Sequence, residues 1–260
     1  MPVTELLICG AEALVRVRTR AFAAGVCEFT VRPGPWLHDP VAGCSRGSLG
    51  VVLDDVTGYL AAARAAPGRW PVSLGIRVDF LADPPLAGEP MVAVGELVSA
   101  DVSGATTRGT LTDADGTVVA LVTQRSHFID AQAPASPALA FSAPEPSATV
   151  REVLGISEPS PGTVELPSTP YAANGRGHVH GGILICGAEF AAMSAIGADG
   201  RFRTLSVDIN YVRPGDALAP TVFRAELCHR GRSLCVVRVV AEGPAGKPYA
   251  FATVTISRRQ

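Results

Sequence analysis

The fold is decided by the stretch Asn174-Gly-Arg-Gly-His-Val-His180-Gly181-Gly182-Ile-Leu-Ile-Cys-Gly-Ala-Glu189-Phe-Ala-Ala-Met-Ser194. Its glycines permit tight turns and keep side chains away from the backbone. After Gly182, apolar residues recur at three- and four-residue steps among several alanines, which predicts a helix from Gly181 to about Ile196. The first amides of such a helix lack partners within it, and the helix dipole is positive there. We therefore expect this end to bind a carbonyl oxygen that gains negative charge.

A set of three polar residues, Asn174, His180 and Glu189, marks the stretch around this helix. The segment also has a purely structural interpretation, a buried helix after a tight turn. In it, His180 is a loop histidine that donates to a backbone carbonyl, and Glu189 is a hydrogen-bonded structural carboxylate. His178 and His180 together could indicate a metal site, but no third ligand follows at a suitable spacing. The set therefore indicates a site without a metal, and a second copy of the plan strengthens that interpretation.

The second copy lies earlier in the chain, at Gly43-Cys-Ser-Arg46-Gly47-Ser48-Leu-Gly-Val-Val-Leu-Asp54-Asp55-Val-Thr57-Gly-Tyr59-Leu60. In the alignment Arg46 takes the place of His180. Asp55 then falls on Glu189, because each lies nine residues further along its copy. The first copy is predicted to have its helix from Gly47 to about Ala65, after a turn at residues 23–25 and a loop over 33–40, and the capping-box spacing of Thr149 and Glu152 predicts a short helix before the second copy. Alternating strands follow in both copies, with residues 73–80 over 204–211 and 118–123 over 248–253. A repeat of this length in the same element order predicts two copies of one domain.

Length and composition agree with two domains. The chain has 260 residues, and an Ala/Pro/Ser-rich segment, 131–146, separates the copies as a linker between domains 1–130 and 147–260. The net charge of −2 and the lack of a Lys/Arg run argue against nucleic acid. No apolar run is long enough for a bilayer, and no signal-peptide order appears at the start. The cysteines are scattered, and three of them lie in apolar runs, which indicates buried free thiols and a cytoplasmic location: Cys186, Cys228 and Cys235.

The motif Asn174-x5-His180-Gly181-Gly182, with a carboxylate nine residues after the histidine and a following Ser-Val-Asp-Ile-Asn-Tyr-Val-Arg-Pro strand, resembles the hotdog-fold acyl-CoA thioesterases, in particular the PaaI-like group. The resemblance covers nearly all of the second half and reaches the first half mainly through the repeat. It implies an α+β fold, a double hotdog with two copies of a long central helix wrapped by an antiparallel β-sheet. It also implies that the asparagine and His-Gly positions polarise a thioester carbonyl and that the helix carboxylate acts as base or nucleophile.

Helix geometry decides how the sites are assembled. Glu189 lies eight residues beyond Gly181, which is about 12 Å along a helix, so it cannot serve a carbonyl at its own helix start. Each helix start must therefore face the carboxylate of the other helix. The predicted catalytic residues are Asp55, Asn174, His180, Gly181, Gly182 and Glu189.

The two predicted sites differ. The start of the second helix faces Asp55 and has the whole polar set, whereas the start of the first has Pro40 and Arg46 in place of Asn174 and His180. We expect the site with Asp55 to work. Because Asp54 precedes Asp55, one of the two should be solvated or capping, and the repeat favours Asp55 as the site carboxylate.

Three functions fit this sequence. The first is hydrolysis of an acyl-CoA thioester to free acid and CoA, without metal or organic cofactor. The second is hydration or dehydration of acyl thioesters on the same fold, although the His-Phe-Pro-Gly setting expected for dehydratases is missing. The third is a non-catalytic acyl-CoA-binding or structural protein, which the degenerate first copy favours. The resemblance also implies that acyl-CoA is the partner, and that the chain forms a homo-oligomer of double-hotdog units.

Overall fold

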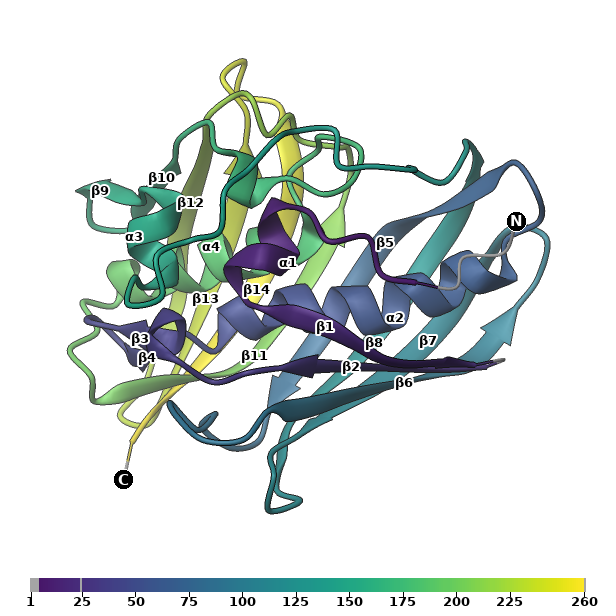
Figure 1. Ribbon diagram of the computed structural model, residues 1–260. Helices are drawn as coiled ribbons and strands as arrows, with labels where there is room; N and C mark the ends of the chain where they lie inside the picture. Colours follow the sequence, from purple (N-terminus) through teal and green to yellow (C-terminus); the bar gives the residue numbers. More distant parts are fainter. Residues whose placement is uncertain (1–4, 24, 260) are drawn as a thin grey trace.

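The structure, a computed structural model, describes residues 5–23 and 25–259, and in this part of the chain one large antiparallel sheet dominates (Figure 1). Its twelve strands follow the order β1-β2-β6-β7-β8-β5-β11-β14-β13-β12-β10-β9. The N-terminal half supplies β1 (Val17–Ala23), β2 (Val26–Val31), β5 (Arg69–Phe80), β6 (Met91–Ala100), β7 (Gly104–Thr112) and β8 (Val118–Asp130). The C-terminal half supplies β9 (Ser157–Ser160), β10 (Thr163–Leu166), β11 (Phe202–Tyr211), β12 (Thr221–Arg230), β13 (Leu234–Glu242) and β14 (Pro248–Arg258). The halves join edge to edge, because β5 pairs with β11.

Alternation of apolar and polar residues gives the sheet one buried and one exposed face. In β8, the even-numbered residues from Ala120 to Phe128 are buried, while the odd-numbered residues from Leu121 to His127 are exposed. Successive side chains of a strand point to opposite faces, so a period of two produces this division. The buried parity of β8 also carries one long polar side chain, Gln124.

Two helices of 15 residues, α2 (Gly50–Arg64) and α4 (Gly181–Ala195), lie on the same face of the sheet (Figure 1). Helix α2 packs on strands of the N-terminal half and α4 on strands of the C-terminal half. Nearly every residue of α4 is buried, since its side chains are apolar all round and the helix lies between the sheet and its neighbours. Among the described residues no helix is both long and apolar enough to cross a membrane.

The two helices run antiparallel and meet at their N-terminal ends. Gly47 lies against Glu189, Gly50 against Ile185, and Asp54 against Gly181. As the residue number rises from Gly47 into α2, the number of the contacting residue in α4 falls, which is the antiparallel arrangement. The approach is close, because a side chain at Gly182 would overlap the backbone of Gly50 and Val51. This crossing places the start of each helix beside the body of the other.

Several elements differ from the expectation. Helix α2 was expected from residue 47, but residues 47–49 form the 3-10 turn η2 (Gly47–Leu49). The loop expected over residues 33–40 contains η1 (Pro35–Leu37) and the strand β3 (His38–Asp39), which pairs with β4 (Gly43–Cys44). The short helices are α1 (Gly10–Leu14), which was not expected, and α3 (Val150–Leu154), which was; η3 (Pro170–Ala172) and β9 were also not expected.

Two further predictions concern residues 131–146 and the cysteines. Residues 131–146, the predicted linker, contain no helix or strand. All six cysteines are free, but Cys228, expected to be buried, is exposed because it lies near the end of β12. Part of the turn expected at residues 23–25 lies outside the described residues.

Candidate active site

His180 is the N-cap of α4, and its side chain closes the first turn of that helix. The amide of Gly182 donates a hydrogen bond of 3.0 Å to Nδ1, which satisfies one of the amides that a helix start leaves unpaired. The ring is buried, with an exposed fraction of 5%. Its backbone amide donates to the carbonyl of Ala172, so both the loop and the cap fix the orientation of the imidazole.

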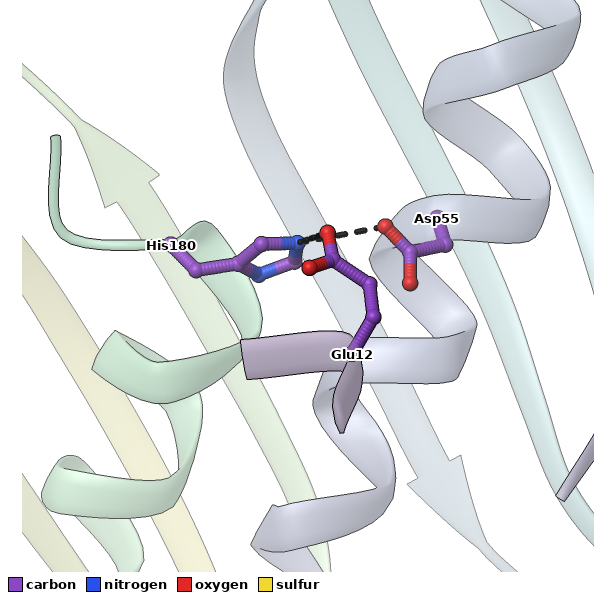
Figure 2. A group of neighbouring side chains, drawn as sticks. All are labelled: Glu12, Asp55 and His180. Carbon is purple, nitrogen blue, oxygen red and sulfur yellow. Dashed lines mark hydrogen bonds and ion pairs between the residues drawn. The ribbon is translucent and has the colours of Figure 1, made fainter. Parts of the chain in front are cut away.

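The other ring nitrogen of His180 faces two carboxylates from different helices (Figure 2). Nε2 lies 3.2 Å from Oδ1 of Asp55 on α2 and 3.5 Å from Oε1 of Glu12 on α1. The sequence analysis paired Asp55 with His180, and the structure brings them together. It did not include Glu12, which lies before the repeat and has no counterpart in the motif.

Burial changes the proton affinity of this cluster. Burial, followed by the charge of Glu12, raises the pKa of Asp55 to about 7. For His180, burial lowers the pKa, but the hydrogen bond and charge of Asp55 outweigh it and hold the pKa above its ordinary value. The amide of Gly182 resists a proton on Nδ1, because two N–H groups would then face each other. The carboxyl group of Asp55 is therefore the member of this cluster that binds and releases its proton near neutral pH.

The same three groups are the candidate metal ligands among the described residues. Glu12, Asp55 and His180 each offer an atom, and these atoms lie within 4.8 Å of one another. A metal on Nε2 would require the ring hydrogen to sit on Nδ1, where the amide of Gly182 points. The donor set therefore suits a proton better than a metal. His178 lies outside the cluster, and its backbone forms an isolated antiparallel β-bridge with Asp216.

The carboxylate nearest the start of α4 is that of Asp54, not Asp55. A Cβ placed on Gly181 would lie 2.5 Å from Oδ2 of Asp54, so the absence of a side chain at Gly181 makes room for this oxygen. The same oxygen lies 3.4 Å from Nδ1 of His180. Burial raises the pKa of Asp54, which makes its carboxylate a stronger base than an exposed one.

Asp54 takes this place because of the turn η2. A 3-10 turn rises about 2.0 Å per residue instead of 1.5 Å, so three such residues advance the chain by about one extra α-helical residue. Helix α4 begins without a 3-10 turn. The position that Glu189 occupies nine residues after His180 is therefore reached one residue earlier in the first copy. The repeat alignment could not detect this shift.

A chain of hydrogen bonds holds Asp54 from the side of the sheet. The hydroxyl of Ser73 on β5 donates to Oδ1 of Asp54 at 3.4 Å, and Nε2 of Gln124 on β8 donates to the Ser73 oxygen at 2.8 Å. Thr57 donates to Oε1 of Gln124, which fixes the direction of the amide. The sequence analysis missed this chain, although Gln124 gave a signal as a polar residue in the buried phase of a strand.

The start of α4 offers an unused donor beside Asp54. No described residue accepts a hydrogen bond from the amide of Gly181, and this glycine is only partly buried. The Tyr211 hydroxyl donates to the carbonyl of Gly181 at 3.0 Å and holds the turn. A carbonyl oxygen at this amide would meet both a free donor and the positive end of the helix dipole.

Asn174 lies in the loop before α4 and organises that loop. Its Oδ1 accepts hydrogen bonds from the amides of Arg176 at 2.9 Å and His178 at 3.2 Å. No hydrogen bond joins its side chain to His180, Asp54 or Gly181 within residues 5–23 and 25–259. The oxygen is thus occupied by the backbone, and only the amide nitrogen is available for another partner.

At the other helix start, the protein itself fills the site. Oε2 of Glu189 accepts a hydrogen bond of 2.7 Å from the amide of Gly47, and Oε1 accepts one of 2.6 Å from the hydroxyl of Thr204. Ser45 donates to Oε2 at 3.2 Å. Burial outweighs these bonds and raises the pKa of Glu189 to about 7. The carboxylate therefore occupies the place where a substrate carbonyl would need the helix amide.

Arg46, which replaces His180 in this copy, closes the same region. Its guanidinium is buried, donates to Asp83 at 2.6 Å and also donates to the carbonyl of Thr204 at 2.8 Å. In α3, Arg151 binds the buried Asp39 and lies over the ring of Phe190. These groups pair with one another, so this helix start is a packed structural centre.

Comparison with known proteins agrees with this architecture. Residues 169–258 match the family model of the acyl-CoA thioesterase N-terminal domain. The chain carries a domain of the hotdog acyl-CoA thioesterase superfamily. The sequence analysis predicted this superfamily, and the match falls on the half that carries the His-Gly-Gly motif. A comparison with curated protein sequences finds no match.

Solved structures extend the hotdog likeness to both halves. The tesB protein of Mycobacterium avium subs paratuberculosis has a TM-score of 0.66 and 13% identity, covering 96% of this chain and 98% of its own. A protein with the hot dog fold from Alicyclobacillus acidocaldarius has a TM-score of 0.62 and 11% identity, covering 98% and 99%. The 12:0-ACP thioesterase of Umbellularia californica has a TM-score of 0.63 and 10% identity, covering 90% and 94%. At these identities the likeness concerns the fold.

Proposed function

We propose that this protein hydrolyses an acyl-CoA thioester to free acid and CoA, with one working site at the start of α4. The observation that carries the proposal is the placement of Asp54 against Gly181, because it brings a base and a free helix amide to one point. The thioesterase-family match on this half supports the same reaction. Each half, 1–130 and 147–260, is then one hotdog with α2 or α4 as its central helix and 131–146 as the connection.

In the proposed reaction the thioester carbonyl accepts a hydrogen bond from the Gly181 amide. The amide and the helix dipole stabilise the negative charge that develops on the carbonyl oxygen. Asp54 removes a proton from a water molecule, whose oxygen attacks the carbonyl carbon. When the C–S bond breaks, the proton on Asp54 passes to the sulfur of the leaving CoA. Ser73 and Gln124 hold Oδ1 of Asp54, so that Oδ2 can face the water.

This assignment gives Asp54 the part that the sequence analysis gave to Asp55. Asp55 instead holds the ring of His180, and His180 holds the Gly182 amide at the same helix start. Asn174 orders the loop that leads into the site. Glu189 closes the other helix start and takes no part in the reaction.

The test is thiol release from acyl-CoA thioesters of increasing chain length, with acyl carrier protein thioesters as a second arm. We expect one thiol per free acid for at least one substrate. The matched control is Asp54→Asn, which keeps the shape and removes the base, and which should lose about 1000-fold in rate. Release of thiol at the same rate by both proteins would remove Asp54 from the mechanism.

The same assay separates the alternatives. A folded protein that binds acyl-CoA but releases no thiol would be a binding protein. Loss of the absorbance of a 2-enoyl thioester without thiol release would show hydration. Either result would overturn the hydrolysis proposal.

A further inference from the structure

A cavity of about 450 Å³ lies beside the loop that leads into the start of α4. Three segments line it: residues 176–178 before the helix, residues 214–218 after β11, and Ala138 with Leu139 from the segment after β8. A volume of this size is ordinary for a site that binds a small molecule. The groups that the proposed reaction uses lie outside this lining, so the reaction alone gives the cavity no role.

The segment 131–146 supplies one wall of the cavity, because it is held against the loop before α4. Nη1 of Arg176 donates a hydrogen bond of 2.9 Å to the carbonyl of Gln132. A Cβ placed on Gly175 would lie 2.9 Å from the ring of Pro134, so the glycine permits the close approach of the two segments. In Figure 1 the segment runs from the end of β8 to α3.

The cavity is close to the amide that binds the carbonyl in the proposed reaction. His178, which lines it, lies three residues before Gly181, and three residues span at most about 11 Å. Arg176 lies five residues before Gly181, at most about 18 Å along the chain. The carbonyl of Gly215, also in the lining, accepts a hydrogen bond of 2.8 Å from the amide of Val179. The wall of the cavity and the helix start are therefore directly connected.

The lining combines one cation with apolar side chains. Arg176 is exposed, and its bond to a backbone carbonyl leaves other guanidinium N–H groups for an anion. Leu218, which is 63% exposed, shares the lining with Leu139 and Pro214. The carboxylate of Asp216 accepts a hydrogen bond of 2.9 Å from the amide of Leu218 and repels a second anion. A ligand with a phosphate therefore fits with that group at Arg176 and its apolar part at the leucines.

In the first copy of the repeat, arginines fill the equivalent region. The loop after β5 there holds Asp83, and both Arg46 and Arg259 donate to its carboxylate. Arg259 also donates to the carbonyl of Ala42, which aligns with Arg176 in the repeat. The protein thus occupies the region beside the closed helix start, whereas the region beside the start of α4 is a cavity.

We propose that this cavity binds the phosphopantetheine arm of the thioester substrate, with Arg176 on the phosphate and Leu218 against the paired methyl groups of the arm. The inference rests on the proposed function, because the arm extends from the thioester sulfur. The phosphate is the part of the arm furthest from the sulfur, and Arg176 is the lining residue of the loop furthest from Gly181. CoA and acyl carrier protein both carry this arm, so the test distinguishes them.

The first test is calorimetric binding of phosphopantetheine and of pantetheine, which lacks the phosphate, to the parent protein. Phosphopantetheine should bind about tenfold more tightly, the scale of one hydrogen bond to a charged group. Arg176→Gln should abolish this difference. Arg232→Gln, which removes an exposed arginine in the turn between β12 and β13, should preserve it. Equal affinities in the parent, an undiminished difference in Arg176→Gln, or no binding of either ligand would overturn the proposal.

Leu218→Ala tests the apolar part of the lining. The leucine is largely exposed, so its loss should leave the fold intact. Both ligands should bind about fivefold more weakly, because both carry the methyl groups. Leu121→Ala, which removes a partly exposed leucine from β8 outside the lining, is the matched control and should change neither affinity. Unchanged affinities in Leu218→Ala would contradict the proposed position of the arm.

Kinetics separate this inference from the proposed function. Arg176→Gln should raise KM for acyl-CoA about tenfold and change kcat much less, since the phosphate does not react. Binding that depends on Arg176 without any thiol release would refute the hydrolysis alone. Hydrolysis with an unchanged KM would refute the arm site alone.

Two further arms identify the source of the phosphopantetheine, and each outcome supports the site. Tighter binding of CoA than of phosphopantetheine would show that the nucleotide adds contacts and that CoA is the source. Equal binding of these two ligands, with a lower KM for the acyl carrier protein thioester than for acyl-CoA, would identify the carrier protein instead.

Discussion

The starts of α2 and α4 are equivalent positions in the predicted repeat, but the carboxylate that faces each of them makes different contacts. At the start of α4 the amide of Gly181 has no hydrogen-bond acceptor among residues 5–23 and 25–259, and the facing carboxylate, Asp54, accepts a hydrogen bond from Ser73 on the sheet. At the start of α2 the facing carboxylate, Glu189, bonds directly to the amide of Gly47. The longer glutamate side chain spans the gap that aspartate leaves open. In the proposed function, this difference of one methylene leaves the start of α4 open to a carbonyl and closes the start of α2.

The surroundings of the two carboxylates reinforce this difference. Thr204 in the second copy lies where Ser73 lies in the first, and each hydroxyl donates to the local carboxylate. In the first copy, Gln124 extends this chain of hydrogen bonds by donating to Ser73. The equivalent position in the second copy is Val254, which pairs with Val207 as Gln124 pairs with Ile76 and has no polar group to donate. The first carboxylate is thus oriented by side chains that leave the helix amide open, whereas the second is held by the Gly47 amide together with Thr204 and Ser45.

Neutralising each carboxylate in turn is the strongest test of the difference between the two helix starts. Asp54→Asn should lower kcat/KM about 1000-fold, because the base is lost while the hydrogen bond from Ser73 can remain. Glu189→Gln should leave kcat/KM unchanged, since its site binds no substrate. Steady-state thiol release measures both. An inactive Glu189→Gln variant together with an active Asp54→Asn variant would mean that the working site is at the start of α2.

Gly181 tests whether room at the start of α4 matters. In Gly181→Ala the new methyl group would meet Oδ2 of Asp54 at 2.5 Å, so the carboxylate must move away from the helix amide. We expect kcat to fall about 100-fold, the scale of one lost oxyanion donor, with little change in thermal stability. Ala245→Gly, in the exposed turn between β13 and β14, is the control for an unrelated change of one methyl group. An unchanged kcat would show that the carbonyl does not bind beside Asp54.

Asn174 distinguishes a loop role from direct contact with substrate. Asn174→Ala removes the acceptor of two backbone amides and should lower kcat/KM about tenfold, which corresponds to about 1.4 kcal/mol. Asn174→Asp keeps the acceptor and should restore most of the activity. If the aspartate variant is as weak as the alanine variant, the amide nitrogen contacts the substrate, as the resemblance implied.

The closed site should appear in the pH dependence of stability. The native Glu189 keeps its proton to about pH 7, whereas an unfolded glutamate loses it near about pH 4.3. Between these values the native state binds more protons than the unfolded state, so the free energy of unfolding falls as pH rises. Glu189→Gln cannot ionise and should be less sensitive to pH than the parent. Urea unfolding at pH 5 and pH 8 measures this. An equal change in the free energy of unfolding between the two pH values for both proteins would contradict it.

The sequence predicted most of the fold because its signals were local. Alternation located the long strands, the alanine-rich periodicity located the helices, and the repeat showed that two halves share one plan. The strand β9 and helix α1 were missed because each is short and carries no periodic pattern. The division at residues 131–146 and the assembly of several chains stay predictions.

The candidate site was predicted in part. His180 and Asp55 do meet across the two halves, as the repeat and helix rise required. The repeat favoured Asp55 over Asp54 as the site carboxylate, because the 3-10 turn at residues 47–49 changes the helix phase and propensity does not reveal such a turn. Glu12 gave no signal at all, because only the tertiary packing of α1 brings it to the imidazole.

The central claim is that one helix start works and the other is closed, and binding stoichiometry tests it most directly. Asp54→Asn protein, which should bind without turnover, is titrated calorimetrically with the acyl-CoA that the parent hydrolyses fastest. The account predicts one molecule bound per chain, and Gly181→Ala introduced into the same protein should weaken that binding. Two molecules bound per chain with similar affinity would contradict it, because the start of α2 would then be an open site.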